Sequence, residues 1–171
     1  MRDASEELGE ATANAYMMER YPNATQLQSE LPGDAKQGQF DQIYLVPGNP
    51  PEVIFVEAKG GASDWGSRKV GDERAEQGST EYMNSIIDNY TQKYDDLANE
   101  LEADPKNEKL IKQVEELKVT LTAIKKAQKD SMNIAPPKKP VLKYVGVKQK
   151  ANDSGIANNI DVTEFKVEVE V

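Results

Sequence analysis

Three ionisable side chains with the spacing of a hydrolytic site lie on one short segment of the chain. Asp41 precedes a β-prone run, and Glu57-Ala58-Lys59 ends the apolar run Val53–Val56. Residues 47–51 between them are rich in proline and glycine, which is typical of a turn and predicts a β-hairpin. Because side chains alternate along a strand, Glu57 and Lys59 share one face, and the hairpin brings Asp41 beside Glu57.

Two carboxylates and one ammonium on a single face suit phosphoryl chemistry. Hard divalent cations such as Mg²⁺ take oxygen ligands and keep several waters. A neighbouring lysine can orient the attacking water while the metal stabilises the charge that develops on phosphorus. The alternative is a surface ion pair at the end of a strand, worth about 0–1 kcal/mol.

Composition narrows the chemistry further. The 171 residues contain no cysteine and no histidine, so a hydrolytic site must use carboxylates, amines, hydroxyls and amides. The length predicts a single domain over residues 1–171. The chain has no run of 18 apolar residues and no visible signal peptide, so we expect no membrane-spanning segment.

The net charge of −9 argues at first against a nucleic-acid partner. However, residues 104–150 carry 12 lysines and 5 acidic residues, whereas residues 1–103 carry 8 basic and 20 acidic residues. The basic segment could supply phosphate contacts. A solvated helix face explains the same lysines equally well.

The remaining elements follow from periodicity. Residues 4–20 read as a helix, with an apolar stripe formed by Leu8, Ala11, Ala15 and Met18. A short edge strand is expected at 25–28, and the Gly/Ser-rich segment after Lys59 reads as a loop in which Trp65 is an anchor packing on the core. Residues 141–150 and 160–171 read as an antiparallel strand pair, with the alternating apolar residues of 160–171 facing one side.

Residues 80–131 read as two long helices that form an antiparallel helical hairpin. Ser79 or Thr80 begins the first, and Asp104 is expected to cap the second, with Pro105 at its first position. Three roles are open for this hairpin: an arm that binds DNA, a dimerisation surface, or a pair that covers the core.

The Asp41 and Glu57-Ala58-Lys59 pattern resembles the PD-(D/E)xK nucleases, with Phe40 in place of the motif's proline, a departure that many members share. The resemblance implies an α/β fold with a restriction-endonuclease-like core of helix, mixed β-sheet and helix, extended by the helical hairpin and the C-terminal strand pair. It implies Mg²⁺, with Mn²⁺ as a substitute, bound by Asp41, Glu57 and the Ala58 carbonyl. Lys59 would position the water. Glu10 on the first helix would complete the site, with Glu6 and Glu7 as rivals.

A longer pattern is similar to nuclease toxin domains of bacterial polymorphic toxins and contact-dependent inhibition systems. It comprises Ser5–Glu10, Val56–Gly61, Ser63, Gly66, Arg68, Val70-Gly71 and Gln77–Tyr82. The resemblance implies a delivered DNase effector that acts in the target-cell cytoplasm and is blocked by an immunity protein. Gln77, on the following helix, would orient Lys59 or a phosphate. Arg68, Lys69 and Arg74 would contact substrate, and Arg68 and Lys69 are also candidate contacts for the immunity protein.

Three alternatives stay open at this point. The chain could be a toxin that cleaves tRNA, or a repair or restriction nuclease that acts in its own cytoplasm. From another class, it could be a non-catalytic interaction module built on the helical hairpin.

Overall fold

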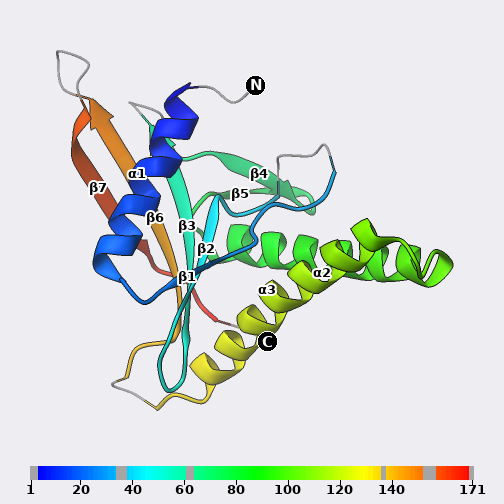
Figure 1. Cartoon of the computed structure of the whole chain (residues 1–171). Helices are drawn as coiled ribbons and strands as arrows, with labels where there is room; N and C mark the ends of the chain where they lie inside the picture. The colour runs from blue at the N-terminus through cyan, green and yellow to red at the C-terminus, as the bar shows by residue number, and fades with distance from the viewer. Residues whose placement is uncertain (1–3, 34–37, 61–63, 136–137, 152–156, 170–171) are drawn as a thin grey trace.

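A five-stranded mixed sheet lies between one helix and a pair of long helices (Figure 1). The computed structural model of the chain describes residues 4–33, 38–60, 64–135, 138–151 and 157–169. The helices are α1 (Ala4–Arg20), α2 (Thr80–Ala103) and α3 (Glu108–Met132). The sheet contains β1 (Thr25–Leu27), β2 (Gln42–Val46), β3 (Glu52–Gly60), β6 (Leu142–Ala151) and β7 (Ala157–Phe165), and a separate pair contains β4 (Ser67–Val70) and β5 (Glu73–Glu76). The fold is therefore of the α/β class.

The strand order is β1-β2-β3-β6-β7, and only β3 and β6 run parallel. A parallel pair needs a long crossover connection, which α2 and α3 supply between β3 and β6. The predicted hairpin is confirmed as β2 and β3. The predicted antiparallel pairing of the last two strands is also confirmed, because Tyr144 on β6 pairs with Phe165 on β7.

Strand β3 is buried on both faces. Its side chains Val53 and Phe55 pack in the cluster formed with α2 and α3, whereas Ile54 and Val56 pack in the cluster formed with α1. This alternation places α1 and the α2–α3 pair on opposite faces of the sheet. The continuous apolar run Val53–Val56 is the sequence pattern expected of a strand covered on both sides.

Helix α1 has the predicted bounds but the opposite buried face. Leu8 and Met18 of the predicted stripe are 51% and 37% exposed, and the buried residues are Gly9, Ala13 and Met17. The reason is close approach: a Cβ on Gly9 would lie 2.9 Å from the backbone nitrogen of Gly60. Only a helix face with small residues at this point can cross the end of β3 so closely.

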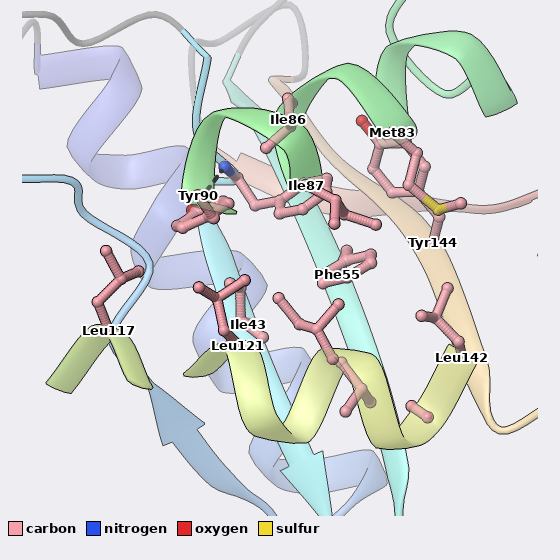
Figure 2. Packing of buried hydrophobic residues seen from close by; sticks show 14 of the residues in the cluster. Ile43, Phe55, Met83, Ile86, Ile87, Tyr90, Leu117, Leu121, Leu142 and Tyr144 are labelled. Carbon is pink, nitrogen blue, oxygen red and sulfur yellow. Dashed lines mark hydrogen bonds between the residues drawn. The ribbon is translucent and has the colours of Figure 1, made fainter. Parts of the chain in front are cut away.

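Helices α2 and α3 cover the core with their sheet-proximal halves. Ile86 and Tyr90 of α2 and Leu121 of α3 are buried together with Phe55 (Figure 2). Ile124 of α3 belongs to the same cluster. The core-covering role is therefore confirmed for this half. The distal half extends beyond the sheet (Figure 1), and its roles as a DNA-binding arm or a dimer surface stay predictions.

The ends of the two long helices follow the prediction only in part. Ser79 caps α2 as predicted, and its side chain accepts a hydrogen bond from the Tyr82 N–H. The expected cap at Asp104 is wrong, because Asn107 caps α3 and Asp104 instead ends α2. Pro105 therefore lies in the connection and not in the first turn of α3.

Two further expectations are corrected. The segment expected to be a loop after Lys59 contains the β4–β5 hairpin, whose two-residue turn has Gly71 at φ 61°. Strand β7 ends at Phe165, and Ile160 and Val162 are exposed because they lie beyond β3 and β6, the strands against which α1 packs. No helix in the described part of the chain is both long and apolar enough to span a membrane.

Neighbouring methionines test which face of α1 is buried. Met17→Ala should lower the free energy of unfolding by about 2–5 kcal/mol, because it leaves a cavity in the core. Met18→Ala is the matched control and should change it by about 0.5 kcal/mol or less. Denaturant unfolding measures both. A larger loss in Met18→Ala than in Met17→Ala would reverse the assignment.

Candidate functional site

Asp41 and Glu57 lie side by side where β2 begins. Gln42 pairs with Val56, so the next residues outward, Asp41 and Glu57, face each other across the two strands. The Ala58 N–H donates a 2.7 Å hydrogen bond to Asp41 Oδ2, and the two carboxyl groups are hydrogen-bonded to each other. The juxtaposition predicted from the hairpin is therefore confirmed.

Glu57 is 1% exposed and depends on donors from distant parts of the chain. Tyr144 on β6 donates its hydroxyl to Glu57 Oε1 at 2.7 Å, and the Gln77 side chain also hydrogen-bonds Glu57. Burial raises the pKa of Glu57 well above its usual value, and the charge of Asp41 raises it further. The bonds from Tyr144 and Gln77 oppose this shift in pKa.

Burial also raises the pKa of Asp41, although the Ala58 N–H and the charge of Lys59 oppose it. Burial and the nearness of the two carboxyl groups both disfavour two uncompensated negative charges at this place. A divalent cation that takes oxygen ligands would compensate them, so the donor set fits Mg²⁺. No group of three acidic side chains in the described residues is arranged to hold a metal, so any ion would draw on two carboxylates, carbonyl oxygen and water.

Lys59 lies on the same face of β3 as Glu57. It is half-buried, and its positive charge is felt at Asp41, where it lowers the pKa. The predicted triad of Asp41, Glu57 and Lys59 is thus gathered at one end of the β2–β3 hairpin. The Ala58 N–H donates a hydrogen bond to Asp41 in this cluster. That the Ala58 carbonyl is a metal ligand stays a prediction.

Gln77 reaches the site from a different position than predicted. It lies in the turn between β5 and α2 and not on the helix. Its Oε1 accepts a hydrogen bond from the Gly66 N–H at 2.9 Å, and its backbone N–H donates to the Gly66 carbonyl at 2.8 Å. The side-chain amide nitrogen is therefore directed at Glu57, so Gln77 positions this carboxyl group and not Lys59.

Glu6 and Glu10 of α1 lie near Asp41, but the described residues contain no group of three acidic side chains arranged to hold a metal. Glu10 is half-buried and lines, with Asp41 and Gln42, a polar cleft of about 360 Å³. The charge of Glu6 also raises the pKa of Asp41. Glu7 is exposed. Both Glu10 and Glu6 thus stay candidates for orienting the site.

Only one of the three predicted substrate-binding cations points inward. Arg68 on β4 is half-buried, and its charge is felt by Tyr82, which Glu57 and Asp41 also influence. Lys69 is exposed, and Arg74 is exposed and bonded to Ser67 on the same hairpin. Arg68 therefore belongs to the site, whereas Lys69 and Arg74 lie on the surface.

Tyr144 and Tyr82 are site residues to which the sequence analysis assigns no role, although Tyr82 belongs to the Gln77–Tyr82 pattern. Tyr144 lies in a correctly predicted strand, but its contact with Glu57 depends on β6 pairing parallel to β3. Tyr82 is half-buried, and burial together with the charge of Glu57 raises its pKa to about 12. It therefore remains a neutral hydroxyl group beside the carboxylates.

Comparison with known proteins assigns the chain to no family. No protein-family model matches the chain, and no curated protein and no solved structure matches it either. The function must therefore be argued from the site itself.

The raised pKa of Glu57 predicts a pH-dependent contribution to stability. The folded protein keeps a proton that the unfolded chain releases near the usual pKa of 4.5. This stabilisation is fully present below that pH and is lost as pH rises through the folded-state pKa, by at most about 1.4 kcal/mol per pH unit. Glu57→Gln should therefore become more stable relative to wild type as pH rises from about 5 to about 8.

Thermal unfolding of both proteins across this range measures the effect. Glu76→Gln, on exposed β5, is the matched control and should not change the slope with pH. A constant difference in stability between Glu57→Gln and wild type would show that Glu57 is not protonated on folding.

Proposed function

We propose that this chain is a metal-dependent nuclease that hydrolyses phosphodiester bonds in nucleic acid. One observation carries the proposal: Asp41 and Glu57 are joined at one end of a hairpin, and Lys59 lies on the same face. A surface ion pair would not have its glutamate 1% exposed and bonded to a tyrosine 87 residues further along the chain. Strongly perturbed carboxyl groups beside a cleft are typical of functional sites.

The arrangement of elements supports a restriction-endonuclease-like core. A first helix, an antiparallel meander of three strands, a helical crossover and a parallel strand follow one another as α1, β1–β3, α2–α3 and β6. This is the order of helix, mixed sheet and helix that the resemblance implies. Since half of residues 80–131 covers the core, this segment serves as the crossover as well as an extension.

Asp41 and Glu57 are the residues that would hold Mg²⁺ or Mn²⁺, with the Ala58 carbonyl as a third ligand. When bound, such an ion supplies Lewis-acid stabilisation of charge on the phosphate oxygens. The chain's own residues do the rest. The Ala58 N–H fixes Asp41, and Tyr144 and Gln77 fix Glu57. Each carboxyl group is thereby held before substrate binds.

Lys59 is the residue that would handle the attacking water. Its ammonium group can donate to water but cannot accept a proton while charged, so it orients the nucleophile and stabilises negative charge on it. Its place two residues after Glu57 puts this donor on the carboxylate face. The polar cleft that Glu10 and Asp41 line reaches the Asp41 side of the site.

Cleavage of nucleic acid tests this proposal. Purified protein should degrade plasmid DNA, or total tRNA if RNA is the substrate, in Mg²⁺ and not in EDTA. Lys59→Ala should lower the rate by about 10²- to 10⁴-fold, the usual contribution of a positioned catalytic group. Gel analysis of timed digests measures the loss.

Lys69→Ala is the matched control, because it removes the same charge from the exposed face of β4. It should cleave at close to the wild-type rate. Metal-independent cleavage, or equal loss in both variants, would contradict the assigned role. A folded protein that cleaves neither substrate would favour the interaction-module alternative.

We further propose that the nuclease is a toxin of the interbacterial type, with a cognate immunity protein as its partner. The support is the motif pattern over residues 5–10 and 56–82 alone. Expression in a bacterial cytoplasm should arrest growth, and Lys59→Ala should restore it at equal protein level. Growth curves with immunoblots measure this. Active enzyme that leaves growth unchanged would favour a repair or restriction role.

A further inference from the structure

A second lysine stands one strand away from Lys59. The parallel register of β3 and β6 pairs Lys59 with Lys148 and Glu57 with Gly146. Directly paired residues of neighbouring strands point to the same face, and the bond from Tyr144 to Glu57 shows that this is the carboxylate face. Lys148 therefore lies on the same side of the sheet as the proposed catalytic residues.

Trp65 holds Lys148 in this position. The Lys148 ammonium lies 5.2 Å from the centre of the Trp65 ring, within cation–π range. The indole packs directly on Gly146, because a Cβ at this glycine would lie only 2.6 Å from Trp65 Cζ2. The Trp65 and Phe165 rings pack edge to face, with 5.4 Å between their centroids and an angle of 80° between their planes. Trp65 thus packs against Gly146 and Phe165 and supports the Lys148 ammonium on the face that also carries Glu57.

Arg68 is a third cation near the site, because its charge acts on Tyr82 together with the charges of Glu57 and Asp41. Its Nη1 atom is buried and has no hydrogen-bond partner in the described part of the chain. Its guanidinium nitrogens lie 3.1 and 3.3 Å from where a Cβ of Gly38 would stand, and this glycine precedes Asp41 by three residues. A buried donor without an acceptor is costly, and an anionic oxygen is the acceptor that a guanidinium binds best.

We propose that Lys148, supported by Trp65, binds a phosphate of the nucleic-acid backbone adjacent to the one held at Asp41 and Glu57, with Arg68 contacting the strand from the Asp41 side. The nucleic-acid strand would then cross the ends of β3 and β6 and would not run along the projecting α2–α3 hairpin. This inference uses the proposed nuclease function to name the ligand, but binding can be measured without any cleavage.

The test is equilibrium binding of fluorescently labelled single-stranded DNA, duplex DNA and single-stranded RNA in EDTA, over a series of salt concentrations. Lys148→Ala should weaken binding about 5- to 10-fold for the preferred strand. It should also reduce the slope of log K against log salt by about 0.7 to 0.9, the loss of one phosphate contact. Lys148→Arg keeps the charge and should retain both affinity and slope.

Lys112→Ala is the matched control, because this exposed lysine lies in the first half of α3, on the projecting hairpin (Figure 1). It should bind as wild type does. Equal losses in both variants, or none in Lys148→Ala, would overturn the proposal, as would a wild type that does not bind at low salt. Unchanged affinity in folded Trp65→Leu would overturn the support assigned to Trp65.

The same variants separate this inference from the nuclease proposal. Cleavage by wild type together with unaltered binding by Lys148→Ala would remove the phosphate site and leave the nuclease. Binding that depends on Lys148 without any metal-dependent cleavage would leave a nucleic-acid-binding protein and remove the nuclease.

Discussion

The buried Glu57 carboxyl group is the constraint on which the rest of the structure depends. A charged or unsatisfied carboxyl group inside a core is costly unless it is paired and hydrogen-bonded. Here the neighbouring Asp41, the Tyr144 hydroxyl and the Gln77 amide together satisfy it. These partners come from the start of β2, from β6 and from the turn before α2, so the site forms only when most of the chain has folded.

This constraint gives each element a defined task. The parallel pairing of β3 with β6 delivers Tyr144 and also Lys148, and it is made by the α2–α3 crossover. The β4–β5 hairpin is held to the turn before α2 by the Gly66–Gln77 bonds, so it fixes the amide that reaches Glu57. On the other face, Gly9 lets α1 pack against the backbone at the end of β3. The site is thereby held from both sides of the sheet.

The sequence predicts what local rules determine. The β2–β3 hairpin follows from turn residues and alternation, so the sequence alone is enough to place Asp41 beside Glu57. It does not place Tyr144, because that contact spans 87 residues and depends on which strand lies next to β3. The sequence also does not predict the buried face of α1. Gly9 and Ala13 are buried there because small residues let the helix approach the sheet closely, whereas a periodicity argument looks for large apolar side chains. Gln77 is identified as a residue, but its place in a turn depends on the unpredicted β4–β5 hairpin.

The acidic net charge becomes informative once the charges are placed. At physiological salt, charges are screened over about 8 Å, so a phosphate at the site responds mainly to nearby groups. These are the cations Lys59, Lys148 and Arg68, and also Asp161, which pairs with Lys148 across β6 and β7. Acidic residues farther away on the surface repel a polyanion that approaches elsewhere. Binding then depends on a few local contacts and not on a broad basic surface. Such a distribution of charge favours contact with a nucleic-acid strand at the site itself, where Asp41 and Glu57 also lie.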